Sequence, residues 1–291
     1  MDQRRLGPRT VSAIGLGEMP LSNPGRPDDA RAIATIHAAL DAGVTLIDTA
    51  DAYATGAGDV GHGEELVARA LARWSGDPSD VLVATKAGHV RTADGGWALD
   101  SRPEHLHRAA RDSLRRLGGE AIGLLQHHRP DPDVPYAEAI GALRELFDEG
   151  LVRLAGISNA DIGQIDEARA ILGDALVSVQ NRFSPAFRAS EDELRHCAEA
   201  GLAFLPWSPL GGISSAAALG DEHAAFADVA AAHDASPQQV CLAWMLAKGD
   251  HVVPIPGSSR PETIRSSAAA ADLRLSADEL ARLDAVPAAS G

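Results

Sequence analysis

Short apolar runs alternate with longer amphipathic segments along the whole chain. The runs are apolar at most positions, which is typical of strands that other elements cover on both faces. They lie at residues 44–47, 81–84, 122–126, 152–157, 176–179, 202–205 and 252–255. A shorter run at residues 14–16 predicts one more strand, and the segment 4–14, centred on Gly7-Pro8, predicts a small hairpin before it.

The segments between these runs carry apolar residues three or four positions apart, which is the spacing of one helix face. They predict helices at residues 28–42, 66–74, 101–117, 136–149, 162–172, 190–200, 221–233, 236–248, 260–271 and 277–286. Two of these helices begin with a serine that is followed three residues later by glutamate. We therefore expect Ser101 and Ser190 to form capping boxes.

Eight strands, each followed by a helix, in a chain of 291 residues favour a (β/α)8 TIM barrel over an open, doubly wound sheet. The short N-terminal β-hairpin precedes this barrel, and an extra C-terminal helix follows it. No linker rich in proline, serine or glycine divides the chain. We therefore expect a single (β/α)8 barrel domain over residues 1–291.

In a barrel of this kind the reactive side chains lie just after the strands, at the C-terminal face. Polar or reactive residues follow seven of the runs: Asp48, Lys86, His128, Ser158 with Asn159, Gln180, Trp207 with Ser208, and Gly257 with Ser258. Each of them alone indicates little, because barrel strands commonly end in polar residues. Together they predict one site on one face.

Asp48 and Lys86 end neighbouring strands, so we expect them to pair, and Tyr53 follows Asp48 by five residues. An ionised lysine beside Tyr53 would favour the tyrosinate and lower the pKa of Tyr53. Such a tyrosine can donate a proton to a carbonyl oxygen while hydride is delivered to the carbon. The structural alternative is an ion pair with a tyrosine packed on the barrel rim.

Lysine is scarce in this chain, which has 24 arginines and two lysines, Lys86 and Lys248. Arginine would serve at most positions that need only positive charge, so we expect Lys86 to have a role that arginine cannot fill. Lys86 can lower the pKa of Tyr53 or, alternatively, form a Schiff base as in a barrel lyase.

Two further patterns lie near the strand ends. His127 and His128 are adjacent, and at most one of them can point into the barrel mouth. No cluster of histidine, cysteine or carboxylates has the spacing of metal ligands, so no metal site is predicted. Residues 56–61 match the dinucleotide pattern G-x-G-x-x-G, but seven residues separate them from Asp48 at the strand end. We interpret this segment as a flexible loop.

The better candidate for a phosphate site is the segment 254–262. A strand ends there, small residues expose their N–H groups, and a helix begins near Pro261. Helix N-termini bind phosphate, and Arg260 adds a positive charge. Barrels commonly place phosphate after strands seven and eight. The alternative is an ordinary capped turn.

Composition narrows the class of protein. The formal net charge is −15, from 26 Lys+Arg and 41 Asp+Glu, which disfavours nucleic acid as a partner. There is no run of about 18 apolar residues to cross a membrane, and the first residues lack the apolar segment of a secretory signal. Cys197 and Cys241 lie in helical segments and are expected to be reduced thiols. We therefore expect a cytoplasmic protein.

Taken together, these residues resemble the aldo-keto reductases, and the likeness extends over about 250 residues. The strings that carry it are AIGLG at 13–17, LIDTADAY at 46–53, GHGEELV at 61–67, VATK at 83–86, QHHRPDP at 126–132, GISN at 156–159, VQNRF at 179–183, WSPLG at 207–211 and IPGSSR at 255–260. No string is unique, but their order and spacing are specific. The resemblance implies a barrel that binds NADP(H) and reversibly reduces an aldehyde or ketone, a small-molecule carbonyl substrate, to the alcohol.

The resemblance also implies roles for individual residues. Tyr53 matches the proton donor, Asp48 and Lys86 match the pair that tunes it, and His128 matches the histidine that orients the carbonyl. The matches at the nicotinamide end are Ser158, Asn159 and Gln180 for the carboxamide and Trp207, where a tyrosine is usual, for the ring. The matches at the phosphates are Ser208, Leu210 and Gly211 for the pyrophosphate, and Gly257, Ser258 and Arg260 around the 2′-phosphate.

Some features depart from the family pattern. The loop 54–61 after Tyr53 is longer than usual, Gly123 replaces a common aspartate, and Ser266 and Ser267 replace a Glu-Asn pair that contacts adenine. Met19 and Trp97 are expected to line the substrate pocket, without indicating which carbonyl compound enters it. A rival function is a cofactor-sensing regulatory subunit with little turnover, like the potassium-channel β-subunits. The sequence indicates no oligomeric state.

Overall fold

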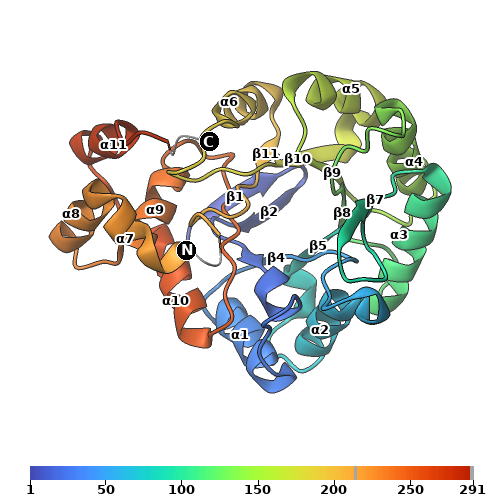
Figure 1. The fold of residues 1–291 in the computed structure, drawn as a ribbon, viewed down its shortest axis with the longest axis horizontal. Helices are drawn as coiled ribbons and strands as arrows, with labels where there is room; N and C mark the ends of the chain where they lie inside the picture. The colour runs from blue at the N-terminus through green and yellow to red at the C-terminus, as the bar shows by residue number, and fades with distance from the viewer. Residues whose placement is uncertain (213–214, 289–291) are drawn as a thin grey trace.

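The computed structural model describes residues 1–212 and 215–288, and a curled, parallel sheet forms its centre (Figure 1). Seven strands follow one another in the order β11-β10-β9-β8-β5-β4-β3. Their bounds are β3 Leu16–Gly17, β4 Leu46–Asp48, β5 Leu82–Ala87, β8 Leu124–His127, β9 Ala155–Ser158, β10 Leu176–Gln180 and β11 Ala203–Phe204. These strands lie within a few residues of the predicted runs.

An irregular segment, residues 252–257, closes the barrel between β11 and β3. The N–H of Val253 donates to the carbonyl of Phe204 at 2.9 Å, and the N–H groups of Gly15 and Gly17 donate to the carbonyls of Pro254 and Pro256 at 3.0 Å. The two prolines have no N–H to donate, so this segment cannot form a regular ladder. The predicted eighth strand therefore occupies its place without regular strand geometry, and the fold is the expected (β/α)8 barrel.

Helices surround the sheet on its outer side, as Figure 1 shows for α1 through α6. Their bounds are α1 Asp29–Asp41, α2 His62–Leu71, α3 Pro103–Leu117, α4 Tyr136–Asp148, α5 Ile162–Leu172, α6 Glu191–Ala200, α7 Leu219–Glu222, α8 Ala224–Ala232, α9 Pro237–Leu246, α10 Pro261–Ala269 and α11 Ala277–Asp284. The helix predicted at 221–233 is interrupted at His223, and α11 is the extra C-terminal helix.

Both predicted capping boxes are wrong. The Ser190 backbone is not extended, with φ −93° and ψ 21°, and its side chain accepts no capping bond. The Ser101 side chain is buried, and its hydroxyl lies 2.8 Å from His127 Nε2 instead of capping α3. Capping boxes are present at Asp161, Ser236 and Ser276.

The N-terminal hairpin, β1 Gln3–Leu6 with β2 Arg9–Ser12, packs against the interior of the barrel at the N-terminal ends of the strands. Its Leu6 and Val11 are buried in the cluster that fills the barrel. Ser12 exchanges two hydrogen bonds of 2.8 Å with Thr45, just before β4. The hairpin therefore covers one end of the barrel and leaves the C-terminal end for a site.

A second hairpin that the pattern did not predict follows β5. It consists of β6 His89–Arg91 and β7 Trp97–Leu99, which pair antiparallel.

Cys197 and Cys241 are buried thiols that form no disulfide. Across residues 1–212 and 215–288, no helix combines the length and the apolar character that a membrane span requires.

Candidate active site

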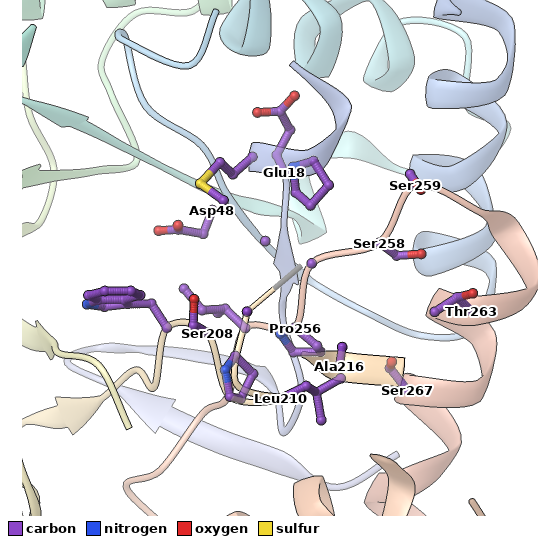
Figure 2. A pocket seen from close by; sticks show the side chains of 18 of the residues that line it. Glu18, Asp48, Ser208, Leu210, Ala216, Pro256, Ser258, Ser259, Thr263 and Ser267 are labelled. Atoms are coloured by element: carbon purple, nitrogen blue, oxygen red, sulfur yellow. The ribbon is translucent and has the colours of Figure 1, made fainter. Parts of the chain in front are cut away.

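A cavity of about 780 Å³ opens at the C-terminal end of the barrel, and we call it the C-terminal cavity. Figure 2 shows Asp48 and Ser208 on one side of it and Ser258, Thr263 and Ser267 on the other. The sequence-predicted residues that line it are Met19, Asp48, Tyr53, Trp97, His128, Ser158, Asn159, Gln180, Trp207, Ser208, Leu210, Gly257, Ser258, Arg260, Ser266 and Ser267. Gly211 is not part of the lining, whereas its neighbour Gly212 is.

Lys86 lies behind the cavity wall, where it joins Asp48 to Tyr53. Its Nζ donates to Asp48 Oδ1 at 2.5 Å and to the Tyr53 hydroxyl at 3.2 Å. A third bond, to the Thr49 carbonyl at 2.8 Å, completes the donor capacity of the ammonium group. β4 and β5 are adjacent and parallel, so the predicted pairing of Asp48 with Lys86 is confirmed.

The second carboxylate oxygen of Asp48 accepts bonds from two buried amides. Gln126 Nε2 donates to Oδ2 at 2.9 Å and Gln180 Nε2 donates to it at 2.8 Å. A buried carboxylate needs such donors as well as its cation. Gln126 was not expected from the sequence, although a polar residue inside an apolar run is a detectable signal.

Burial decides the direction in which the pKa of Tyr53 shifts, because Tyr53 is only 8 % exposed. Burial raises the pKa of Tyr53, and the charge of Lys86 lowers it by less, so the net direction is upward. The sequence-based expectation of a lowered pKa is therefore wrong for this structure. Burial also lowers the pKa of Lys86, but Asp48 and Tyr53 outweigh it and the net direction is upward, which keeps the ammonium charged.

Only one of the two adjacent histidines enters the cavity. The His128 ring lies edge-on to Tyr53, with 5.9 Å between centroids, and 5.0 Å from His89. Burial lowers the pKa of His128 well below its usual value, so the ring is neutral. His127 points to the other side of β8, toward Ser101.

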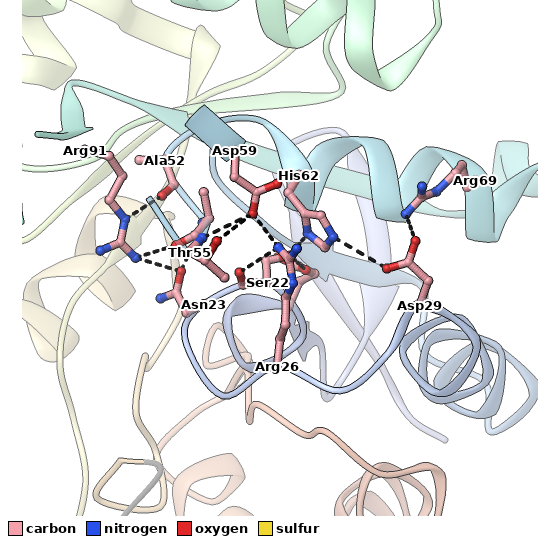
Figure 3. Close-up of polar contacts among 12 residues, drawn as sticks. Ser22, Asn23, Arg26, Asp29, Ala52, Thr55, Asp59, His62, Arg69 and Arg91 are labelled. Carbon is pink, nitrogen blue, oxygen red and sulfur yellow. Dashed lines mark hydrogen bonds and ion pairs between the residues drawn. The ribbon is translucent and has the colours of Figure 1, made fainter. Parts of the chain in front are cut away.

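Arg91 anchors the chain on both sides of Tyr53 (Figure 3). Its guanidinium donates to the carbonyl of Ala52 at 3.2 Å and to that of Ala54 at 2.8 Å. A further bond reaches Asn23 Oδ1 at 3.0 Å, and the same oxygen accepts the Ala54 N–H at 3.1 Å. Arg91 therefore limits how far the Tyr53 backbone can move, a role that no sequence pattern indicated.

Aromatic side chains gather at one rim of the C-terminal cavity. The indole of Trp97 stacks on His89 with 4.3 Å between centroids, and the Arg91 guanidinium lies 3.5 Å from the indole centroid. Trp97 is 41 % exposed, so it stands at the rim. Met19 lines the cavity at the end of β3. Both residues expected in the substrate pocket therefore line the C-terminal cavity, as Tyr53 and His128 do.

Two side chains on the opposite wall are held in left-handed backbone conformations, Asn159 with φ 59° and Ser208 with φ 48°. Such positions are costly for residues other than glycine and cluster at functional sites. Trp207 Nε1 donates to Asn159 Oδ1 at 3.2 Å, and Ser158 Oγ donates to the Gln180 carbonyl at 2.7 Å. This wall is therefore a preorganised polar surface beside an indole.

The far end of the cavity is the N-terminus of α10. The helix begins at Pro261, as predicted, and Arg260 stands just before it, partly exposed, with Glu262 as its nearest acid at 3.6 Å. Ser258 Oγ accepts the Arg260 N–H at 3.1 Å, which fixes the turn. A Cβ on Gly257 would lie 2.7 Å from Pro20 Cγ, so only glycine fits there.

The loop 56–61 lies outside the cavity lining, in agreement with its interpretation as a loop.

The C-terminal cavity thus joins a buried phenol, a neutral histidine, a polar wall with an indole, and a helix N-terminus. Its length and chemistry suit an extended ligand with a planar ring at one end and phosphate at the other. Among residues 1–212 and 215–288, no three His, Cys, Asp or Glu side chains are grouped as a metal site would require.

Comparison with known proteins identifies the family. The model of the aldo/keto reductase family matches residues 13–288. Pyridoxine 4-dehydrogenase of Escherichia coli is 34% identical over 291 residues, which cover 97% of this chain and 96% of that protein. An uncharacterized oxidoreductase of Schizosaccharomyces pombe is 33% identical over 284 residues, which cover 96% of this chain and 88% of that protein.

A solved structure supports the same assignment. The aldo-keto reductase from Klebsiella pneumoniae, solved in complex with NADPH, is similar with a TM-score of 0.80 and 29% identity, covering 98% of this chain and 95% of that chain. The family match spans nearly the whole sequence, and the site lies where a barrel of this kind places its chemistry. The chain belongs to the aldo/keto reductase family, a family of oxidoreductases that reduce carbonyl compounds.

Proposed function

We propose that this protein reduces an aldehyde or ketone to the alcohol with NADPH, and that Tyr53 donates the proton. The observation that carries the proposal is the buried chain Asp48–Lys86–Tyr53, with the phenol facing the C-terminal cavity beside His128. A proton donor must lie within reach of the oxygen it protonates, and the cavity gives a carbonyl compound access to Tyr53.

Each of four side chains has its own role in the proposed proton transfer. Tyr53 holds its proton at neutral pH because the ordinary pKa of a phenol, about 10, is well above 7, and burial raises the pKa of Tyr53 further. When the proton moves from the phenol oxygen to the carbonyl oxygen, negative charge develops on Tyr53, and Lys86 Nζ stabilises it from 3.2 Å. Asp48 keeps Lys86 charged and in place. His128, which is neutral, can donate a hydrogen bond to the same carbonyl oxygen.

NADPH supplies the hydride when it is bound. The wall of Ser158, Asn159 and Gln180 offers polar groups for a carboxamide, and Trp207 offers an indole face for the ring. Ser208, Leu210 and Gly211 are proposed for the pyrophosphate, and Gly257, Ser258 and Arg260 for the adenosine phosphate. The left-handed Asn159 and Ser208 and the glycine that the turn at 257 requires support this fit. The NADPH in the Klebsiella structure supports it from the family side.

Replacing Arg260 by alanine is expected to raise the Kd for NADPH by roughly 10- to 100-fold, the value of a lost charge-assisted hydrogen bond, and to change the Kd for NADH far less. The reason is that only NADPH carries the 2′-phosphate. Fluorescence titration with both cofactors measures the two constants. Arg265→Ala, which changes an exposed arginine within α10 and outside the cavity lining, is the matched control. Equal losses for NADPH and NADH would refute the role of Arg260.

The Schiff-base alternative is disfavoured by the position of Lys86. A lysine that attacks a carbonyl must be neutral and open to the substrate. Lys86 is 1 % exposed, is absent from the cavity lining, and has a raised pKa. Borohydride trapping of a carbonyl compound on Lys86 would restore this alternative.

A screen of NADPH oxidation over a panel of carbonyl compounds tests the proposed function and its sensor alternative together. The panel should contain pyridoxal, because the relative from Escherichia coli is named for pyridoxine, and aromatic and short aliphatic aldehydes. Trp97 and Met19 favour compounds with an apolar part. Tight NADPH binding without turnover on any compound would favour the regulatory subunit.

A further inference from the structure

Glu18 is a buried carboxyl group that the proposed reaction does not use. It follows β3, at the C-terminal face of the barrel that also carries Asp48, and its side chain has no exposed surface. Glu18 is among the residues that line the C-terminal cavity, but Figure 2 shows its carboxyl group pointing away from the interior. Within the part of the chain that the structure describes, no lysine, arginine or histidine lies within ion-pair distance of it. A buried carboxyl group without a cation requires an explanation.

Two hydroxyl groups enclose the carboxyl group. Ser22 Oγ bonds to Oε1, and Thr49 Oγ1 bonds to Oε2 at 3.0 Å. On the third side α2 approaches so closely that a Cβ on Gly63 would lie 2.6 Å from Oε2 and 2.7 Å from Thr49 Oγ1. The site is therefore built tightly around Glu18, and glycine at position 63 makes room for it.

A chain of hydrogen-bonding groups leads from Glu18 to the surface. Ser22 Oγ lies 2.9 Å from His62 Nδ1, and His62 Nε2 lies 3.7 Å from Asp29 Oδ1 (Figure 3). The Asp29 side chain is 54 % exposed and pairs with Arg69 at 2.8 Å. Serine hydroxyl and imidazole both accept and donate, so this chain can carry a proton in either direction.

On its inner side Glu18 is linked to the Asp48–Lys86 pair. The Glu18 N–H donates to the Asp48 carbonyl at 2.8 Å. Thr49, whose hydroxyl binds Glu18, accepts Lys86 Nζ with its own carbonyl at 2.8 Å. The charges that face Glu18 from the barrel side are Asp48, Lys86 and, when ionised, Tyr53.

The charges on the outer side act through His62, which Arg26, Asp59, Asp29 and Arg69 surround. Burial raises the pKa of Glu18 to about 8, against the lowering effect of Ser22, Thr49 and Lys86. The group is therefore a neutral acid at pH 7 and an anion above about pH 8. The anion raises the pKa of Tyr53 further, because it disfavours a second negative charge nearby.

We propose that Glu18 is a positioning residue that exchanges its proton with solvent through Ser22 and His62 and, once ionised, helps to keep the proton on Tyr53 in alkaline solution. On ionisation the Glu18 proton passes to Ser22 Oγ, the Ser22 proton passes to His62 Nδ1, and the His62 Nε2 proton leaves to Asp29 or water. No other bond changes. The consequence for catalysis rests on the proposed role of Tyr53, whereas the titration of Glu18 does not.

The direction of the effect follows from the charges. Below about pH 7 Glu18 carries no charge, so Glu18→Gln is expected to leave Tyr53 unchanged there. Above pH 8 the wild type gains an anion that the variant lacks. We therefore expect the pKa of Tyr53 to be lower in Glu18→Gln than in the wild type, by about half a unit or more. The alkaline loss of carbonyl reduction should shift to lower pH by the same amount.

The chain contains two tyrosines, so the pKa of Tyr53 can be measured directly. In a Tyr136→Phe background the ultraviolet absorbance of tyrosinate reports Tyr53 alone, without any catalytic turnover. The protein is titrated with and without Glu18→Gln, while circular dichroism confirms that it stays folded. Glu65→Gln removes an exposed carboxylate on α2, the helix that carries His62, and is the control that should produce no shift.

Infrared spectroscopy tests the proton on Glu18 itself. Because burial also raises the pKa of Asp51, the spectrum of Glu18→Gln is subtracted from that of the wild type. In this difference spectrum we expect the band of a protonated carboxylic acid at pH 6.5 and its loss above pH 8. Ser22→Ala keeps the carboxyl group but removes its donor, so the band should persist to higher pH and the Tyr53 titration should move toward that of Glu18→Gln. A band already absent at pH 6.5, or Tyr53 titrations that coincide in the wild type and Glu18→Gln, would overturn the proposal. If the titration and infrared results are as expected but the wild type reduces no carbonyl compound, the proposed function fails and the titration of Glu18 stands.

Discussion

Replacing Tyr53 by phenylalanine is expected to lower kcat/KM for carbonyl reduction by about 10²- to 10⁴-fold, the contribution of a positioned general acid. The phenyl ring keeps the edge-on packing with His128, so the cavity keeps its shape. Only the hydroxyl disappears, and with it the partner of Lys86 Nζ at 3.2 Å. NADPH binding should stay nearly unchanged, because the residues proposed to hold the cofactor lie on other strands and at α10.

Tyr136→Phe is the matched control for this experiment. It removes the only other tyrosine hydroxyl, which is buried at the start of α4 and makes no hydrogen bond among the described residues. Its removal should leave turnover and cofactor affinity as they are. Steady-state kinetics and fluorescence titration with NADPH measure both quantities. A Tyr53→Phe variant that keeps most of its activity would show that another group donates the proton.

Much of the site could be predicted because it lies at strand ends. Strands of a barrel share one direction, so residues that end them meet at one face even when they are far apart in the sequence. Asp48 and Lys86 are 38 positions apart and form a bond of 2.5 Å, as their places on β4 and β5 require. The alternation of side chains along β8 likewise allows only one of His127 and His128 to enter the cavity.

The residues that were missed act through contacts without a sequence period. Arg91 binds two backbone carbonyls beside Tyr53, and carbonyls are present at every position of every chain. Gln126 belongs to the apolar run 122–126, and the prediction used the residue that follows this run, His128, instead of Gln126. Glu18 follows β3, which like β11 has only two residues. The barrel rule applies to the end of β3 as it does to the other strands, but the run at 14–16 is the one run after which no site residue was predicted.

The direction of the Tyr53 pKa shift could not be predicted from the sequence. Pairing with Lys86 is a local property that strand positions reveal, whereas burial depends on everything that packs around the phenol. Hairpin β6–β7 packs beside the site through His89 and Arg91, and the sequence had no strand pattern there. The local effect was predicted with the correct sign, and the larger, collective effect reversed the sum.

Replacing Lys86 by methionine is expected to destabilise the fold by about 3 kcal/mol, as is typical when one partner of a buried ion pair is removed. Asp48, which is 2 % exposed, would then keep only the amides of Gln126 and Gln180 as donors. Carbonyl reduction should fall by roughly 10²-fold or more, because the developing charge on Tyr53 loses its cation. Lys248→Met is the control, since Lys248 pairs with a half-exposed Asp284 at the surface. This substitution should lower the free energy of unfolding by less than about 1 kcal/mol.

The double variant Asp48→Asn/Lys86→Met separates folding from chemistry. Asparagine removes the buried charge that Lys86→Met leaves without a cation, so urea unfolding should show recovery of most of the lost free energy of unfolding. Activity should stay as low as in Lys86→Met, because Tyr53 still lacks the ammonium group behind its oxygen. Recovery of both stability and activity would mean that Lys86 serves the fold alone. Recovery of neither would mean that the pair is not coupled as its 2.5 Å bond implies.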